Sequence, residues 1–329
     1  MEDGRLRNLN GFFRNTFGGK VYKVGLWGGF SCPNRDGTFS TGGCSFCNPL
    51  SSRPVSFHNG ADVLEQLEAG CRYVAERYGV SAFLPYFQDY TTTYGDVSRL
   101  RRLYTAVLAH PGVVGLSLCT RPDCLPEPVI DLLEELSRRT FLWVELGVQT
   151  SDERLLRDMN RCHGAEESGD AFRRLHARGI LTGAHMILGY PGSSGRTVPD
   201  DAAFLRECGA AGIKLQNFHV VKGTAMEKRY RSGEFRLTGM REYVDRVIQF
   251  LEHTHPGAVI MRLTGQAPAH LTVGPRWSLD KSGILKAIRK EMELRDSWQG
   301  KALGHSRDAL REPSIAGERG NVRTIAGTP

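Results

Sequence analysis

Strand-like and helix-like hydrophobic patterns alternate along the first two thirds of the chain. Short apolar segments typical of buried strands lie at residues 21–26, 82–87, 113–119, 141–148, 180–188 and 213–221. Between them, apolar residues recur at every third or fourth position, which predicts helices across residues 63–74, 97–108, 126–136, 152–160, 166–178 and 199–211. Because parallel strands need crossover connections, six such units in succession predict a parallel sheet.

Two α/β architectures compete for this pattern, an open doubly wound sheet and a full or partial barrel. No Gly-x-Gly-x-x-Gly fingerprint follows the first predicted strand, which weakens the dinucleotide-binding version of the open sheet. A polar or glycine-rich segment follows each strand, as an active site at the carboxyl ends of barrel strands requires. We therefore predict a partial (β/α)6 barrel of the TIM type over residues 21–224.

The flanking regions differ from this core. Residues 225–299 predict an α-rich C-terminal extension packed on the barrel, with a helix, a short strand and a second helix at residues 240–251, 259–262 and 280–295. Residues 1–20 form a basic N-terminal segment, and residues 300–329 are polar without periodicity, so we expect them to be disordered.

Composition narrows the class of protein. With 40% hydrophobic residues in 329, the chain can bury a sizeable core, yet it contains no apolar run of the ~20 residues that a membrane span needs. Its start lacks the pattern of a secretory signal, so we expect a cytoplasmic protein without a membrane partner. The net charge is +7, and residues 1–23 and 300–329 supply most of it. Basic ends indicate either adaptable contacts with a polyanion or solvated tails.

Three of the eight cysteines form a cluster directly after the first predicted strand, at Cys32, Cys44 and Cys47. The other five are scattered, and buried small hydrophobic residues are their default interpretation. Cys44-x-x-Cys47 lets two thiolates reach one metal. A structural zinc site would want a fourth ligand, for which His58 is the nearest candidate, and a thiol–disulfide site is a further alternative. Three thiolates without an obvious fourth fit a [4Fe–4S] cluster that leaves one iron open.

The spacing Cys32-x11-Cys44-x2-Cys47 after the first strand of a βα repeat resembles the radical S-adenosylmethionine (SAM) superfamily. More narrowly, Cys-Pro-Asn-Arg-Asp-Gly…Gly-Gly-Cys-Ser-Phe-Cys-Asn resembles the YhcC/YtqA-type family, relatives of the Elongator catalytic subunit. The resemblance covers about residues 18–300 and continues at residues 86–91, 115–117, 120–125, 143–149, 212–215, 222–224, 262–265, 275–279 and 296–300. It implies a [4Fe–4S] cluster on the three cysteines and SAM on its open iron. It also implies a reductant such as flavodoxin or ferredoxin and a 5′-deoxyadenosyl radical that takes hydrogen from a substrate.

Candidate SAM contacts follow the predicted strands. Glu145 and Gln149 lie on one face of the fourth strand, and a Glu in a buried strand requires a ligand or an internal basic partner such as Arg. In similar enzymes of the coproporphyrinogen-oxidase type, residues matching Gln149 and Arg161 touch SAM. His185 occupies the matching position on the fifth strand and is equally well explained as a core histidine. Gln88 stands where the superfamily contacts the methionine amine, or it stabilises a turn.

A second set of residues is predicted around the adenine and the substrate. Gly189 after the fifth strand allows the backbone to approach adenine, or it serves a tight turn. Arg121 is a candidate for holding a substrate carboxylate or phosphate, and pairing with Asp123 is equally possible. Lys222 and Arg276 are further candidate substrate contacts.

Kinship to the Elongator catalytic subunit favours tRNA, with a wobble uridine as the modified position. Residues 225–329 are too few for an acetyltransferase domain, so we do not expect acyl transfer of the Elongator kind. Two alternatives stay open: a radical SAM enzyme acting on a small molecule, and a zinc-stabilised, non-catalytic nucleic-acid-binding protein.

Overall fold

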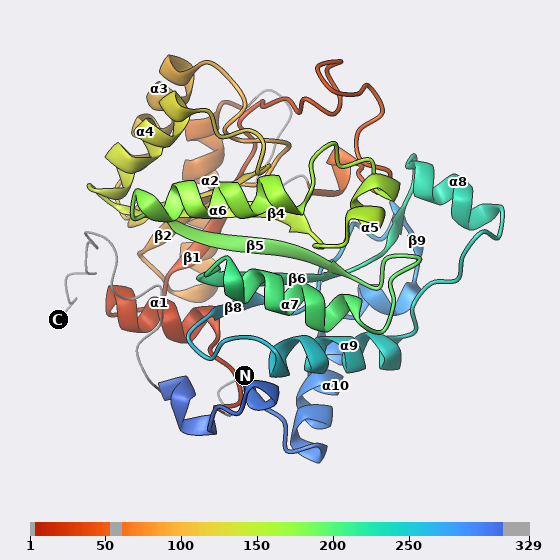
Figure 1. Cartoon of the computed structure of the whole chain (residues 1–329). Coiled ribbons are helices and arrows are strands. Elements are labelled where there is room, and N and C mark those ends of the chain that lie inside the picture. The colour runs from red at the N-terminus through yellow and green to blue at the C-terminus, as the bar shows by residue number, and fades with distance from the viewer. Residues whose placement is uncertain (1–3, 53–60, 312–329) are drawn as a thin grey trace.

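A single curled sheet organises the protein (Figure 1). The computed structural model describes residues 4–52 and 61–311. Its sheet has the order β1-β2-β3-β4-β5-β6-β8, and every neighbouring pair is parallel. These strands are β1 (Tyr22–Leu26), β2 (Phe83–Phe87), β3 (Gly115–Thr120), β4 (Phe141–Gln149), β5 (Leu181–Leu188), β6 (Gly212–Asn217) and β8 (Val259–Arg262). The predicted partial barrel is confirmed, and the extension adds a seventh strand that was not predicted as part of the sheet.

Helices cover the convex face of this sheet. The crossover helices are α2 (Val63–Tyr78), α3 (Val97–Leu108), α4 (Glu127–Ser137), α5 (Glu153–Asp158), α6 (Ala165–Ala177) and α7 (Thr197–Glu207), and the extension carries α8 (Ala225–Arg231), α9 (Met240–Glu252) and α10 (Lys281–Leu294). Asp62 and Asp96 cap α2 and α3 by accepting hydrogen bonds from backbone N–H groups of the first turn. No helix in the described part of the chain is long and apolar enough to cross a membrane.

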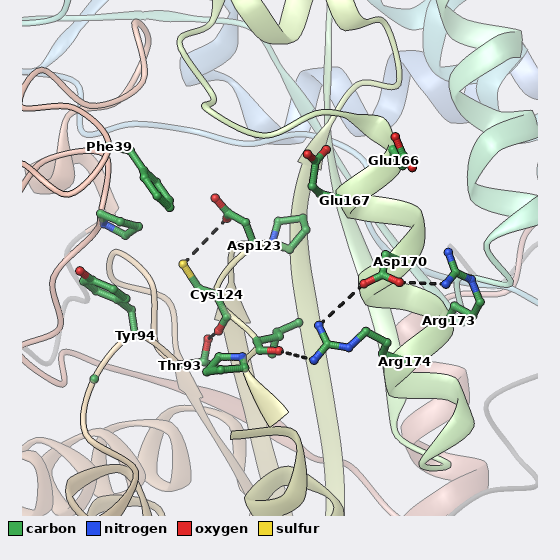
Figure 2. A pocket seen from close by; sticks show the side chains of 15 residues that line it. Phe39, Thr93, Tyr94, Asp123, Cys124, Glu166, Glu167, Asp170, Arg173 and Arg174 are labelled. Atoms are coloured by element: carbon green, nitrogen blue, oxygen red, sulfur yellow. Dashed lines mark hydrogen bonds and ion pairs between the residues drawn. The ribbon is translucent and has the colours of Figure 1, made fainter. Parts of the chain in front are cut away.

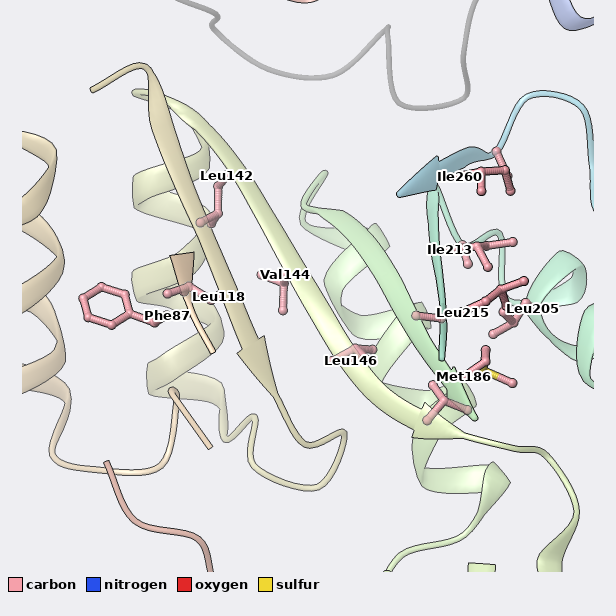
Figure 3. Close-up of a cluster of buried hydrophobic side chains, with 14 of the residues drawn as sticks. Phe87, Leu118, Leu142, Val144, Leu146, Met186, Leu205, Ile213, Leu215 and Ile260 are labelled. Atoms are coloured by element: carbon pink, nitrogen blue, oxygen red, sulfur yellow. The ribbon is translucent and has the colours of Figure 1, made fainter. Parts of the chain in front are cut away.

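Strand β4 shows how the sequence separates the two faces of the sheet. Leu142, Val144 and Leu146 pack into the main hydrophobic core between strands and helices (Figure 3). The alternate residues Trp143 and Glu145 lie on the concave face, as the period-two pattern predicts. The concave face is thus divided into an aromatic layer and a charged one.

Two predicted boundaries were wrong. The sixth strand ends at Asn217, and the next residues, Val220–Val221, form β7 of a separate antiparallel ribbon with β9 (Thr272–Gly274). This ribbon adjoins the carboxyl end of the sheet. Helix α7 ends at Glu207, four residues before its predicted end, and the chain then turns through Gly209 in the left-handed region, with φ +65°.

The N-terminal segment is folded, which the hydrophobic pattern did not predict. Helix α1 (Leu9–Phe17) buries Phe12, Phe13 and Phe17 against Phe141 and Trp143 at the end of the strands opposite α5 and α8 (Figure 1). These rings pack edge-on and close that end of the half-barrel.

The C-terminal residues contact the start of the N-terminal segment, where Arg307 donates to the Gly4 carbonyl at 3.1 Å. Residues 300–311, expected to be disordered, form the short 3₁₀ turns η3 (Lys301–Leu303) and η4 (Arg307–Arg311). Residues 312–329 lie outside the described residues. The division of the chain into the four predicted regions stays a prediction.

The burial of α1 leads to a prediction about the stability of the protein. Phe17 is fully buried, so Phe17→Ala should lower the free energy of unfolding by about 3–5 kcal/mol, through lost burial and an internal cavity. Urea unfolding followed by circular dichroism measures this change. Leu294→Ala, at a side chain 70% exposed, is the control and should change stability by less than about 0.5 kcal/mol. Equal effects of the two substitutions would show that α1 does not close the core.

Candidate active site

The cysteine-containing loop, residues 31–48, is held across the carboxyl ends of the strands. The amide of Ser45 donates to the carbonyl of Met159, 2.9 Å away, and the Asn160 side chain donates to the carbonyl of Gly43 at 2.8 Å. Thr91 donates its amide to Ser31 at 3.2 Å. The loop is therefore fastened to the segments that follow β2 and α5, where barrel enzymes place their chemistry.

Cys44 lies in a polar, buried environment. Arg161 Nη1 donates to its sulfur at 3.2 Å, and the Asn34 amide lies 3.5 Å from the same sulfur. Burial alone would raise the pKa of the Cys44 thiol, but the charge and hydrogen bond of Arg161, with the charge of Arg121, lower it below its usual value. The site therefore favours a thiolate, the form that binds metal.

Cys32 and Cys47 complete the predicted set. Burial raises the pKa of Cys47 to about 11, and the charges of Cys44 and Cys32 add to this effect. Within residues 4–52 and 61–311, no three His, Cys, Asp or Glu side chains converge closely enough to hold one metal ion. In a [4Fe–4S] cluster each cysteine binds a different iron, so its sulfurs stay farther apart than the ligands of a single ion. His58, the candidate zinc ligand, lies outside the described residues.

The donor set around these sulfurs suits a cluster and an anionic ligand beside it. Arg161 Nε and Arg121 Nη1 are buried N–H donors that have no hydrogen-bond partner among the described residues. Donors near thiolate sulfurs stabilise the negative charge of a bound cluster. The residues present therefore fit the [4Fe–4S] cluster that the cysteine spacing predicts.

The structure brings two of the predicted SAM contacts together. Arg161 is buried and also donates to the carbonyl of Gly147 at 2.6 Å. A Cβ added to Gly147 would lie 3.0 Å from Gln149 Nε2 and 3.3 Å from Arg161 Nη2, so a larger residue there would crowd both groups. Gln149 itself has a left-handed φ of +75° at a register shift between β4 and β5. Gln149 and Arg161 thus lie side by side next to Cys44.

Glu145, by contrast, is the centre of a buried ionic network on the concave face. Its Oε2 accepts from Lys214 Nζ at 2.8 Å and from His185 Nε2 at 2.5 Å. Its Oε1 accepts from Ser117 Oγ at 2.8 Å and from Lys23 Nζ. Both carboxylate oxygens are engaged, which favours the interpretation that Glu145 has internal basic partners. These partners are lysines and not the arginine that the sequence suggested.

Charges in this network shift several pKa values. Burial would raise the pKa of Glu145, yet Lys214, Lys23 and His185 hold it well below its usual range. Burial lowers the pKa of Lys214 to about 8 despite Glu145. Burial and then the charge of Lys214 lower the pKa of His185 to about 3, so this ring is neutral at physiological pH and its Nε2–H donates to Glu145. His185 Nδ1 lies 3.9 Å from the Cys119 sulfur.

Gln88 and Gly189 both lie at the carboxyl edge of the sheet, directly after β2 and β5. Gly189 has φ +82°, and a Cβ there would lie 2.7 Å from Thr238 Oγ1, so the tight turn requires glycine. The next residue, Tyr190, places its hydroxyl 3.1 Å from Ser45 Oγ in the cysteine-containing loop. The turn after β5 is therefore attached to that loop.

The three predicted substrate contacts separate into two environments. Arg121 is 3% exposed and binds Asp123 through two nitrogens, at 2.9 and 2.7 Å, which favours the pairing interpretation. Lys222 and Arg276 are exposed at the ends of the β7–β9 ribbon. The amide of Lys222 donates to Leu271, and its carbonyl accepts from Asn48 next to Cys47, so this ribbon touches the cysteine-containing loop.

Sequence reasoning missed several site residues. Lys23 and Lys214 are single charges inside apolar strand segments, and such a charge signals a buried partner. The Tyr86 hydroxyl accepts from Lys214 at 2.8 Å, and its ring faces both lysines. Asn34 stands inside the cysteine motif, but nothing in its spacing indicated a bond to Cys44.

Known proteins resemble this chain in sequence and in fold. The radical SAM superfamily profile matches residues 35–205, and that of the radical SAM C-terminal domain matches residues 210–294. The uncharacterized protein YtqA of Bacillus subtilis is 40% identical over 297 residues, 90% of this chain and 92% of that protein. The tRNA uridine(34) acetyltransferase of Methanocaldococcus infernus is 27% identical over 187 residues, 55% of this chain and 33% of that protein. The solved structure of Elp3 from Methanocaldococcus infernus, lacking residues 1 to 46, has a TM-score of 0.63 at 18% identity, covering 85% of this chain and 64% of that one.

The neutral state of His185 leads to a prediction about how the free energy of unfolding depends on pH. An unfolded histidine binds a proton below about pH 6.5, whereas folded His185 stays neutral down to about pH 3. Its contribution to stability is therefore complete above pH 6.5 and is lost as the pH falls, by about 1.4 kcal/mol per pH unit. We expect His185→Gln to unfold with a weaker pH dependence between pH 7 and 5, measured by urea titration. His270→Gln, at an exposed histidine, is the matched control. Parallel pH profiles for wild type and His185→Gln would contradict the assignment.

Proposed function

The chain belongs to the radical SAM superfamily and is a radical SAM enzyme, and we propose that Cys32, Cys44 and Cys47 hold its [4Fe–4S] cluster. SAM would bind beside this cluster at the open end of the half-barrel. The observation that carries the proposal is the position of Arg161, whose guanidinium joins the Cys44 sulfur to the end of β4. Ligand-binding groups and cluster ligands thus share one edge of the sheet.

The protein contributes position, charge and exclusion of water. When bound, the cluster supplies the electron for reductive cleavage of SAM, which yields a 5′-deoxyadenosyl radical that takes hydrogen from the substrate. Arg161, with its unpartnered Nε, would bind the SAM carboxylate, and the Gln149 amide beside it would orient the methionine group. The loop of residues 31–48 and the turn at Gly189 would shield the reaction from water. Glu145 holds Lys23 and Lys214 in place below the site.

We further propose tRNA as the substrate, with a uridine as the reacting nucleotide. Two observations support this choice. A partial relative is named a tRNA uridine(34) acetyltransferase, and the β7–β9 ribbon presents two exposed cations, Lys222 beside the cysteine-containing loop and Arg276 after β9. Exposed basic side chains bind phosphates. Trp277, the residue after Arg276, is half-buried and packs against Tyr243, which fixes the backbone that carries Arg276.

The cluster assignment predicts the effect of three single substitutions. Cys32→Ala, Cys44→Ala and Cys47→Ala should each abolish assembly of the cluster, because each removes one of its ligands, and 5′-deoxyadenosine release from SAM should cease. Cys208→Ala is the matched control and should retain both. Iron and sulfide content, absorption near about 400 nm and product chromatography measure the outcome. A colourless wild-type protein that binds one zinc would instead support the non-catalytic alternative.

The substrate assignment predicts modified nucleosides after incubation of the reconstituted enzyme with SAM, dithionite and bulk tRNA. Mass spectrometry of the digested tRNA detects them. Lys222→Ala and Arg276→Ala should each weaken tRNA binding and reduce the salt slope, d log K/d log[salt], by about 1 in magnitude. Arg72→Ala on α2 is the surface control. SAM cleavage with unchanged nucleosides, and tRNA binding indifferent to salt, would favour a small-molecule substrate.

A further inference from the structure

The ionic layer on the concave face of the sheet, which comprises Lys23, Glu145, His185, Lys214 and Arg262, contains more cations than carboxylates. Lys23 and Lys214 share the single carboxylate of Glu145. Arg262 donates to neutral acceptors, the Leu215 carbonyl at 3.3 Å and Gln216 Oε1 at 2.7 Å, and forms no ion pair among the described residues. Three basic side chains therefore face one carboxylate, and the layer carries excess positive charge.

The pairing of β6 with β8 places two of these cations side by side. Arg262 lies opposite Lys214 in the register of the two strands. The guanidinium of Arg262 reaches Gln216, which is two residues after Lys214 and therefore on the same face of β6. Like charges directly opposite each other on neighbouring strands destabilise a sheet. An anion bound between the two side chains would remove this repulsion.

Solvent reaches the ionic layer although the strands around it are buried. On the concave face, Cys119, His185 and Gln216 are each partly exposed, whereas the residues on either side of each one are buried. The side chains of Lys23 and Lys214 are 19% and 10% exposed. A ligand that enters the half-barrel can therefore contact the layer.

The ionic layer lies below the groups proposed to bind SAM. On β4, Glu145 stands two residues before Gly147, whose carbonyl accepts from Arg161 at 2.6 Å, and four residues before Gln149. Because a strand rises about 3.3 Å per residue, between about 7 and 13 Å separate the layer from these groups. A nucleotide-sized molecule spans this distance, so a substrate anchored on the layer would extend toward SAM.

The large groove outside the half-barrel offers no comparable site for an anion (Figure 2). This groove has a volume of about 1140 Å³ and is lined by the cysteine-containing loop, the loops after β2 and β3, and the first half of α6. Both of its arginines are already ion-paired, and four carboxylates line it, so it repels anions. The charged side chains that line it are Asp123, Glu166, Glu167, Asp170, Arg173 and Arg174.

We propose that Arg262 and Lys214, supported by Lys23, form a subsite for an oxyanion, a carboxylate or a phosphate, carried by the reacting part of the substrate. The inference rests on the proposed function and deepens it, because it concerns the substrate that the radical attacks. A guanidinium binds either oxyanion through two N–H groups, and the ammonium adds charge. A plain uracil base carries no oxyanion. The group in the half-barrel is therefore the phosphate of the reacting nucleotide or a carboxylate on its base.

Equilibrium dialysis of the anaerobically reconstituted protein against radiolabelled phosphate and, separately, radiolabelled acetate tests the subsite. We expect the wild type to bind about one equivalent, and Arg262→Gln to bind at least about tenfold more weakly because the amide carries no charge. Arg262→Lys keeps the charge and should stay within about threefold of wild type. Arg289→Gln, at an exposed arginine on α10, is the matched control and should stay within about 1.5-fold.

Saturating SAM without reductant should leave the binding of phosphate and acetate intact. Loss of binding when SAM is added would show that the layer holds the carboxylate of SAM, and would overturn the substrate subsite. No binding by the wild type, or equal binding by wild type and Arg262→Gln, would overturn it as well, while the cluster spectrum still supports the proposed function. Absence of the cluster spectrum would overturn the proposed function whatever the dialysis shows.

Two tRNA preparations, each incubated with SAM and dithionite, distinguish the sources of the oxyanion. Transcribed tRNA carries phosphates and unmodified bases, whereas tRNA isolated from cells that lack this enzyme also carries modified bases. Modification of both, reduced at least about tenfold by Arg262→Gln, would identify the phosphate. Modification of cellular tRNA alone, with the same loss, would identify a carboxylate on the base. Modification indifferent to Arg262→Gln would overturn the subsite. If neither tRNA is modified, the tRNA assignment is wrong, and the dialysis still decides whether the subsite exists.

Discussion

The contact of Glu145 with two lysines from distant strands is the constraint on which the half-barrel depends. In sheet order β4 is three strands from β1 and two from β6, so in a flat sheet Lys23 would lie about 14 Å away. Lys23 nevertheless reaches the same carboxylate as Lys214, because the curl of the sheet brings β1 closer to β4. Removal of Glu145 would leave the two lysine charges without a counter-ion on this face, at a cost of several kcal/mol. The ionic layer therefore fixes the curvature that brings the strand ends together.

This layer also divides the interior along the strand direction. Below it, the rings of Phe12, Phe17 and Trp143 close one end with apolar contacts, and above it lie Gln149 at the end of β4 and Arg161 in the segment after α5. Ligand-binding groups can therefore gather at one end without opening a channel through the core. The arrangement follows from burial energetics, because polar side chains without partners are tolerated only where a ligand or solvent can reach them.

The C-terminal extension participates in the site as well as covering the sheet. Met226 in α8 donates its amide to the Ser45 carbonyl at 3.0 Å, and Asn48 donates to Lys222 at 2.8 Å. The cysteine-containing loop is thus held between the strand ends and the extension. The β7–β9 ribbon is therefore hydrogen-bonded to the loop that carries Cys32, Cys44 and Cys47.

The sequence by itself determined the alternation of strands and helices, the two faces of β4 and the three cysteines, because period and ligand spacing are local properties. It also predicted Gln149 and Arg161 by resemblance, and the structure places them side by side. It did not predict that α1 is a plug, that β8 joins the sheet, or that Glu145 pairs with Lys23 and Lys214. Those contacts join residues at least 47 positions apart along the chain. Only the closure of the sheet decides which of them meet, so tertiary structure alone separated an ion-paired Arg121 and Glu145 from the exposed Lys222 and Arg276.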